Sequence, residues 1–185
     1  MFKKLAITVA AAALAGIGAP ALAQTATSNL SVTASVAQRC SIATTPVAFG
    51  AYDPVSTNSA GTGVDLNGTG ALSVTCTKNS TGVTITLGLG ANFTGTTRRL
   101  VANLSPTEFL TYELYHASAT TPTAPCTFPG TTVWGTTGSG IFTPTGVTNW
   151  GANAAKSFNV CGTVARGQDA ASDSYTDTVV ATVNF

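Results

Sequence analysis

The chain has 185 residues, of which 44% are hydrophobic and only 8% are charged, with 8 Lys+Arg, 7 Asp+Glu and one His. This length fits one domain of ordinary size, and the sequence shows no repeat or linker that would divide it. Charges this sparse and balanced exclude a basic surface for nucleic acid, and the hydrophobic content excludes the composition of a disordered chain.

The first residues have the pattern of an export signal. Two lysines at positions 3 and 4 precede an apolar, alanine-rich run, and the small residues ending at Ala23 are typical of a cleavage site. The run is shorter than the roughly 20 apolar residues of a membrane span. We therefore expect a signal peptide over residues 1–23 and an exported, soluble mature chain from Gln24 onward.

Threonine dominates the polar residues of this expected mature chain. Its 162 residues (185 minus 23) contain 33 threonines but only 6 basic and 7 acidic side chains, for a net charge of −1. Thr is β-branched, favours extended backbone and offers water a hydroxyl without a charge. With Gly and Pro scattered throughout, the composition predicts an all-β fold.

Alternation of apolar and polar residues predicts the strands, because successive side chains of a strand face opposite sides. In chain order, the apolar positions are Leu30, Val32, Ala34 and Val36; Val47 to Phe49; Leu72, Val74 and Cys76; Val83, Ile85, Leu87 and Leu89; Leu110, Tyr112 and Leu114; and Phe158, Val160, Gly162 and Val164. Residues 58–70 are expected to form a loop, and residues 117–155 a loop with short strands. Short strands separated by turns indicate a single immunoglobulin-like β-sandwich.

The last predicted strand extends from residue 175 to the end of the chain. One face carries Tyr175, Val179, Ala181, Val183 and Phe185. Termini usually fray, so an aromatic residue in core phase at the last position indicates a strand that a partner holds. Asp177 interrupts this face, and it lies either at the mouth of the strand or beside an arginine, with Arg98, Arg99 and Arg166 as the candidates.

The first predicted strand, residues 30–36, precedes every cysteine, so no disulfide holds it. An apolar N-terminal strand of this kind can pair with another molecule by strand addition. Alternatively it closes its own domain as an ordinary edge strand. The sequence pattern leaves both possibilities open.

Four cysteines lie in the expected mature chain: Cys40, Cys76, Cys126 and Cys161. An even number of cysteines in an exported protein indicates two disulfides. None belongs to a CxxC motif or a histidine cluster, which argues against zinc. Three pairings are possible, and we favour Cys40–Cys76 with Cys126–Cys161 because strands close in sequence are the commonest neighbours.

Residues suited to catalysis or metal binding are few. His116 is the single histidine and no G-x-S-x-G motif occurs, so nothing supports a hydrolytic triad. Glu108 and Glu113 are the only glutamates, and no further feature marks them as a glycosidase pair. The aspartates at 169, 173 and 177 match no EF-hand spacing. We therefore expect no enzyme activity, no cofactor and no metal.

Several motifs extend over essentially the whole mature chain. They are the alternation from Leu30 to Val36, Cys40-Ser41-Ile42, Phe49-Gly50-x-Tyr52-Asp53, Gly70-Ala71-Leu72-Ser73-Val74-Thr75-Cys76, Leu110-x-Tyr112-x-Leu114-Tyr115, Trp134-Gly135, and the ending from Ser174 to Phe185. Their order and spacing resemble the spore coat protein U domain family, which includes the major subunits of archaic chaperone–usher pili.

The resemblance implies a sandwich that lacks one strand and is completed by the N-terminal extension of the next subunit. A periplasmic chaperone would hold the open groove until an outer-membrane usher exchanges it for that extension. In this sequence the donor would be residues 24–38, with Leu30, Val32, Ala34 and Val36 inserted, and the pilin domain would be residues 39–185. Cys40–Cys76 matches the usual disulfide of the family, whereas Cys126 and Cys161 are less typical.

The leading hypothesis is therefore a structural pilus subunit. It would pass through the periplasm, polymerise with copies of itself at the cell surface and support adhesion or biofilm formation. A second hypothesis is a monomeric exported binding domain whose loops between Trp134 and Trp150 present aromatic residues to a sugar. A deposited coat protein of the same fold is a third.

Overall fold

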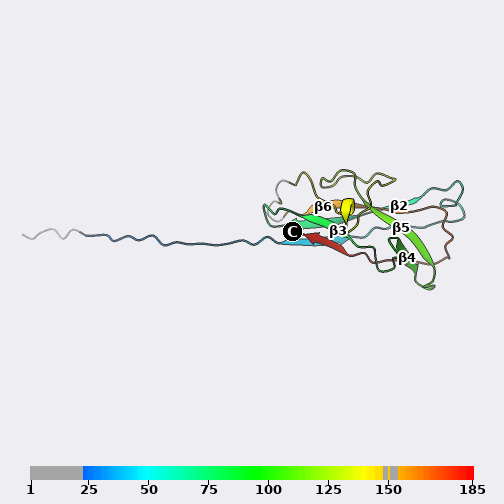
Figure 1. Ribbon diagram of the computed structural model, residues 1–185, viewed down its shortest axis with the longest axis horizontal. Coiled ribbons are helices and arrows are strands. Elements are labelled where there is room, and N and C mark those ends of the chain that lie inside the picture. Colours follow the sequence, from blue (N-terminus) through cyan, green and yellow to red (C-terminus); the bar gives the residue numbers. More distant parts are fainter. Residues whose placement is uncertain (1–22, 148–149, 151–153) are drawn as a thin grey trace, which may run out of the picture. The chain divides into compact units, whose positions relative to one another are not determined.

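The computed structural model describes residues 23–147, 150 and 154–185 (Figure 1). The chain divides into two units, Met1–Ser35 and Val36–Phe185. The expected signal peptide lies outside the described residues except for Ala23. Within the described part of the chain, no helix is both long and apolar enough to cross a membrane.

The described residues form an all-β arrangement with one short 3-10 turn, η1 (Gly138–Gly140). The strands are β1 (Cys40–Thr45), β2 (Leu66–Cys76), β3 (Thr84–Leu87), β4 (Arg98–Ala102), β5 (Phe109–His116), β6 (Lys156–Val164), β7 (Tyr175–Thr176) and β8 (Ala181–Asn184).

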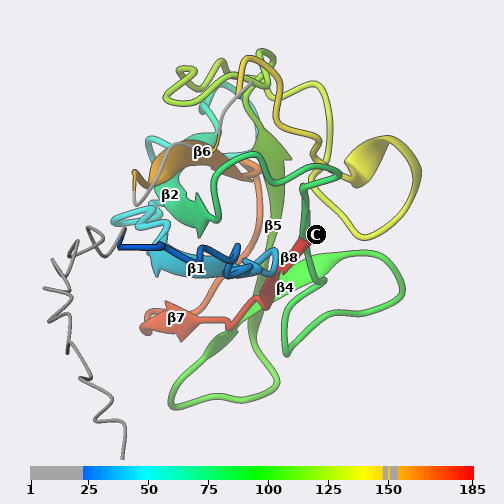
Figure 2. The same ribbon diagram turned by 90° about the vertical axis from the view of Figure 1, so that its left-hand side faces the viewer.

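Two antiparallel sheets contain these strands. The larger has the order β1-β2-β6-β5-β4-β7 and forms a curled layer (Figure 2), and the smaller pairs β3 with β8. In the larger sheet Leu72 of β2 lies opposite Phe158 of β6, and Tyr112 of β5 lies opposite Val164. The immunoglobulin-like sandwich expected from the sequence is confirmed.

The core follows the predicted alternation. Leu110, Tyr112 and Leu114 of β5 are buried, and the residues between them are partly exposed. The same alternation holds along β2 from Leu72 to Cys76. Burial of these apolar side chains supplies the main driving force for folding, about 1.5–3 kcal/mol for each large one.

Residues 66–70 form the first part of β2, so the loop predicted over residues 58–70 ends too late. The glycines that suggested a loop are needed for close packing within a strand. A Cβ at Gly70 would lie 2.6 Å from the carbonyl oxygen of Thr45, and one at Gly68 would lie 2.9 Å from that of Ala48. Both distances are shorter than a Cβ can tolerate, so glycine lets residues 45–48 pass close over β2.

The predicted C-terminal strand is two strands in different sheets. β7 pairs with β4, where Val101 lies opposite Thr176, and β8 pairs with β3, where Leu87 lies opposite Ala181. Residues 177–180 cross from one sheet to the other. Apolar residues occupy the same face before the crossing, at Tyr175, and from Val179 onward, and for this reason the sequence suggested one strand interrupted only by Asp177.

The predicted strand over residues 30–36 does not form in this structure. Residues 23–39 have no regular secondary structure, and no β-ladder of the described residues includes them. A strand requires a hydrogen-bonded neighbour, which the alternation of side chains cannot supply.

Arg98 is a buried cation that the sequence analysis did not identify, and β4 was missed with it. The side chain is 0% exposed and forms an ion pair with Glu113 of β5. Its nitrogens also donate to the carbonyl oxygens of Gly88, at 2.7 and 3.0 Å, and Trp134, at 2.6 Å. Arg98 therefore joins β4, β5 and the two irregular segments that follow β3 and β5.

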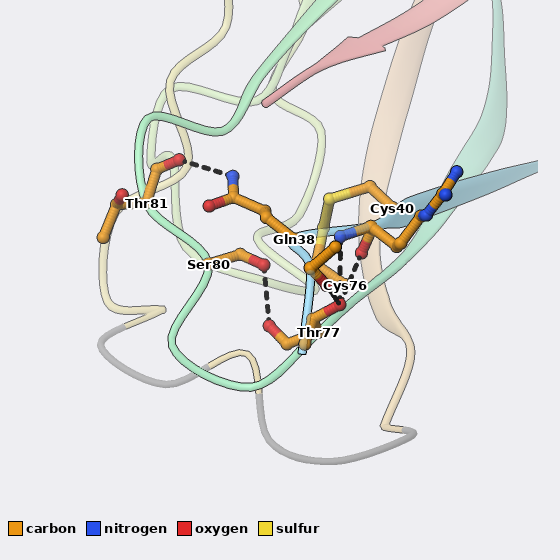
Figure 3. Close-up of a disulfide and its surroundings, with 8 residues drawn as sticks. Gln38, Cys40, Cys76, Thr77, Ser80 and Thr81 are labelled. Atoms are coloured by element: carbon orange, nitrogen blue, oxygen red, sulfur yellow. Dashed lines mark hydrogen bonds between the residues drawn. A yellow bond between two sulfur atoms is a disulfide. The ribbon is translucent and has the colours of Figure 1, made fainter. Parts of the chain in front are cut away.

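The structure has two disulfides, Cys40–Cys76 and Cys126–Cys161. The first joins the facing ends of β1 and β2 (Figure 3). Close by, the backbone N–H of Arg39 donates to Thr77 Oγ1 at 3.0 Å, and Gln38 Nε2 donates to the carbonyl oxygen of Thr81 at 2.9 Å (Figure 3). Residues 38–39 are thus fixed to the turn after β2.

The second disulfide fastens the irregular segment after β5 to β6. Cys126 and Cys161 are 35 residues apart in the chain. Closing a loop of this size lowers the entropy of the unfolded chain, which raises the free energy of the unfolded state by roughly 4 kcal/mol at 25 °C. We expect the Cys126→Ala/Cys161→Ala variant to lose about that much free energy of unfolding, measured by urea denaturation under non-reducing conditions. An unchanged urea midpoint would contradict this expectation.

Candidate functional site

The smaller sheet has an open edge along β8. On its closed side, the N–H of Gly88 donates to the carbonyl oxygen of Val180 at 2.9 Å. Ile85 of β3 instead exchanges backbone hydrogen bonds with Phe142, on the side of β3 away from β8. Because backbone groups alternate between the two sides of a strand, those of Ala181 and Val183 are directed away from β3.

These outward groups of β8 have no strand beside them. β8 pairs only with β3 among the described strands, although it lies near β1. Unpaired N–H and C=O groups along an edge are a template for pairing with an additional strand.

Two adjoining hollows lie beside the segment that leads into β8 and reach Ala181 at the start of that strand, and we call them together the groove. The first, of about 210 Å³, lies between residues 44–49 and residues 177–181. Its apolar floor is formed by Leu72, Leu87, Leu100, Tyr112, Leu114 and Val160. The second, of about 880 Å³, lies between residues 47–55 and residues 170–177. Val47, Phe49, Leu100 and Asp177 line both hollows, so the two lie next to each other.

The predicted groove-edge residues lie on the inner face of the C-terminal segment. Tyr175, Val179 and Ala181 line the groove, and Val183 packs partly buried against the core. Phe185 lies one residue beyond β8 and is 53% exposed. Within this chain, its ring therefore does not fill the core position that its phase suggested.

The predicted donor residues are exposed. Leu30, Val32 and Val36 are 87%, 85% and 84% exposed, and Ala34 is exposed as well. Large aliphatic side chains that alternate along a segment and remain in water are a signature of a surface that another element covers.

Asp177 lies in the groove where the chain crosses between the sheets, and of the two possibilities left open for it, the arginine partner does not occur among the described residues. Its Oδ1 accepts the N–H groups of Ala91, at 2.9 Å, and Asn92, at 3.2 Å. Its Oδ2 accepts the hydroxyl of Tyr112 at 2.6 Å. A Cβ at Gly90, whose φ is +93°, would lie 2.0 Å from that Oδ2, so glycine is required for the carboxylate to dock.

Burial raises the pKa of Tyr112 above its ordinary value, and its hydrogen bond to Asp177 raises it further. The folded protein therefore keeps the Tyr112 proton at a pH where an unfolded tyrosine loses it. The contribution of this group to stability is complete below the unfolded pKa, about 10, and declines as the pH rises above it.

Tyr112→Phe tests this polar contact in the groove. At neutral pH we expect the variant to lose about 1–2 kcal/mol, because Asp177 loses a donor. Above pH 10 the free energy of unfolding of the wild type falls by about 1.4 kcal/mol more per pH unit than that of the variant. The difference in stability between the two proteins therefore narrows. Urea unfolding between pH 7 and 11 measures how the stability of each protein changes with pH. The same pH dependence in both proteins would refute the role given to the Tyr112 hydroxyl.

Both tryptophans lie in the core, which contradicts their proposed display to a sugar. Trp134 is 0% exposed and its Nε1 donates to the carbonyl oxygen of Ile85 at 3.1 Å. Trp150 is 3% exposed and lies 6.4 Å from the ring of Phe158. The aromatic faces of this region are covered by the protein itself.

The polar residues considered for catalysis lie apart from one another. His116 is half-buried against Phe142, and Glu113 is paired with Arg98. Glu108 is in the turn between β4 and β5, and Asp173 accepts the N–H of Leu104 at 2.7 Å. Among the described residues, no group of three or more His, Cys, Asp or Glu side chains is placed to hold a metal ion.

Comparisons with known proteins place the chain in a family. The family model described as "Spore Coat Protein U domain" matches residues 26–182. The chain is 42% identical over 191 residues to "Protein U" of Myxococcus xanthus, covering 98% of this chain and 96% of that protein.

Among solved structures, the chain is similar to one in a CsuC–CsuE chaperone–tip adhesion subunit pre-assembly complex from archaic chaperone–usher Csu pili of Acinetobacter baumannii. The identity is 18% and the TM-score is 0.48, with 81% of this chain and 40% of that chain covered. The family model and the curated relative together cover nearly the whole sequence, and the chain belongs to the Spore Coat Protein U domain family.

Proposed function

We propose that this protein is a structural subunit of a surface pilus, in which residues 24–38 of one copy fill the groove of the next. The observation that carries the proposal is the unpaired edge of β8 next to an apolar groove that reaches Ala181, in a chain that also has an exposed segment of alternating aliphatic residues. An added strand would supply both the backbone partners and the apolar side chains that the groove lacks.

The donor and the C-terminal segment beside which it would lie match in length. Leu30 to Val36 and Asp177 to Val183 each contain four positions on one face, which extend about 20 Å in a strand. Burying Leu30, Val32 and Val36 would contribute about 1.5–3 kcal/mol each. Ala34 would contribute least, and the backbone ladder would add to the stability of the joint.

We expect the donated strand to run antiparallel to β8, as the strand pairs within the described residues do. The C-terminal segment runs from Tyr175, opposite Ala102, to Asn184, opposite Thr84. A donor antiparallel to β8 would enter beside Asn184 and leave beside Tyr175. Its residues 36–38 would therefore emerge among the loops 52–58 and 165–174, which adjoin this end of the groove.

Other partners and the location follow from such assembly. An open apolar groove aggregates in water unless it is covered, so a periplasmic chaperone would hold it before assembly and an outer-membrane usher would catalyse the exchange. The polymer would be displayed at the cell surface, where it would support adhesion or biofilm formation.

The test is the polymer itself. Surface material sheared from cells and run unheated on an SDS gel should give a ladder that collapses to one band on boiling. Deleting residues 24–38 should leave a subunit that still folds and is capped but forms no ladder. A ladder that persists after the deletion would refute donor-strand assembly.

A deposited coat protein is the second candidate, favoured by the 42% identity to Protein U and by the name of the family. For a coat protein assembled without strand donation, the deletion variant should still be deposited in normal amounts. Immunoblots of the sheared and coat fractions from wild-type and deletion strains separate the two functions.

A further inference from the structure

Most charged residues of the unit Val36–Phe185 lie at its two ends, which carry opposite net charge. Three basic residues, Arg39, Lys78 and Lys156, lie where the N-terminal segment joins β1, and we call them the basic end. Arg39 and Lys78 flank the hydrogen-bonded contact with Thr77, and Lys156 lies opposite Val74, two residues before the end of β2. No acidic side chain of the described residues is placed with them.

Five acidic residues lie among the loops at the other end, and we call them the acidic end: Asp53, Asp65, Glu108, Asp169 and Asp173. Asp65 precedes β2 and accepts the N–H of Arg166, and Asp173 accepts the N–H of Leu104 in the turn that holds Glu108. Arg166 and Arg99 reduce the charge here from −5 to −3.

The remaining charges do not connect the two ends. Arg98 and Glu113 neutralise each other in the only ion pair among the described residues, and Asp177 is in the groove. The side chains of the basic end therefore have no internal counter-charge. The two ends of the unit therefore carry opposite net charge, although the chain has only 8% charged residues.

We propose that the basic end of each copy faces the acidic end of its neighbour at every joint of the polymer. This inference rests on the proposed function and adds the surface that surrounds the donated strand. A donor antiparallel to β8 leaves the groove at the acidic end, and Arg39 follows it directly. Arg39 and Lys78 of the donating copy are thereby brought to the acidic loops of the accepting copy.

The opposite direction of insertion would place two basic ends together. The complementary contact steers the donor toward the groove in the correct direction and acts on the rate of association more than on the lifetime of the joint. Because the charges are at the surface, salt screens them over about 8 Å at physiological ionic strength.

The test compares assembly rates of purified full-length chains, followed by the appearance of SDS-resistant ladders. Variants are Arg39→Glu/Lys78→Glu at the basic end, Glu108→Lys/Asp169→Lys at the acidic end, and the combination of all four. At about 50 mM NaCl we expect each single-end variant to assemble about tenfold more slowly and the combination to recover to within about twofold. At about 500 mM NaCl the variants should converge with the wild type.

A matched control separates facing charges from net charge. The basic-end variant is combined with lysines at four exposed threonines of the segment between β5 and β6, Thr131, Thr136, Thr137 and Thr143, which restores the original net charge. We expect no recovery, because the acidic end is unchanged. Recovery in this control, or failure of the four-residue combination to recover, would overturn the inference.

The outcome for the inference is distinct from the outcome for the proposed function. Ladders that form at the same rate in every variant and at every salt concentration would refute the contact between ends and leave donor-strand assembly intact. Absence of ladders in the wild type would refute both. Thermal unfolding of each variant, with a midpoint expected to match that of the wild type, verifies that the substitutions leave the fold unchanged.

Discussion

Replacing Val32 or Val36 by aspartate should abolish the SDS-resistant ladder. Either substitution removes about 1.5–3 kcal/mol of apolar burial and brings a charge into a groove floored by Leu72, Leu114 and Val160. Among the described residues, the first hollow is lined by no basic residue that could pair with the new aspartate. Its one charged group is the carboxylate of Asp177, which would repel it. We expect at least a hundredfold loss of polymer, measured by densitometry of unheated gels.

Ser35→Asp is the matched control for this prediction. Ser35 lies between Ala34 and Val36, so in a strand its side chain faces away from the groove. The variant carries the same charge in the same segment and should keep the ladder. Equal loss of polymer in Ser35→Asp and Val36→Asp would show that charge in the segment matters and the strand phase does not.

Glu113→Gln should cause the largest loss of stability of any single substitution considered for this protein. It leaves the 0%-exposed guanidinium of Arg98 without its counter-charge, and Arg98 joins β4 to the segments that contain Gly88 and Trp134. Breaking a buried ion pair by removing one partner costs about 3–5 kcal/mol. Urea unfolding at pH 7 should show a loss of about 3 kcal/mol, since Glu113 retains some exposure.

Glu108→Gln provides the comparison, because Glu108 is the other glutamate of the chain and makes no ion pair among the described residues. It should change the free energy of unfolding by less than about 0.5 kcal/mol. If both glutamine variants lose the same amount, the ion pair does not support the fold as described.

The chain also shows where local pattern misleads. Leu66–Gly70 contains two glycines and an asparagine, which is a loop composition, yet it is part of the long strand β2. The glycines serve the close passage of residues 45–48, a requirement set by a segment about 20 positions earlier in the chain. β4 was missed because Arg98 occupies a buried position, and an isolated arginine gives no sign of the partner that makes its burial possible.

The sequence by itself determined the fold class. Period-2 alternation, threonine content and turn residues were sufficient for an all-β sandwich, because they express the local preference of the backbone and the need to bury one face of each strand. Family motifs pointed to the same fold and to a strand contributed by another copy.

Only the tertiary structure decided how the C-terminal segment is used and what surrounds it. Alternation cannot show that residues 177–180 cross between sheets, since the apolar residues on either side of Asp177 keep the same phase. The crossing depends on Asp177 meeting the N–H groups of Ala91 and Asn92 and the hydroxyl of Tyr112, all contributed by distant strands and loops. The distribution of the six basic and seven acidic side chains of residues 24–185 between the two ends is likewise invisible in a balanced composition, because strand pairing determines which of them share an end.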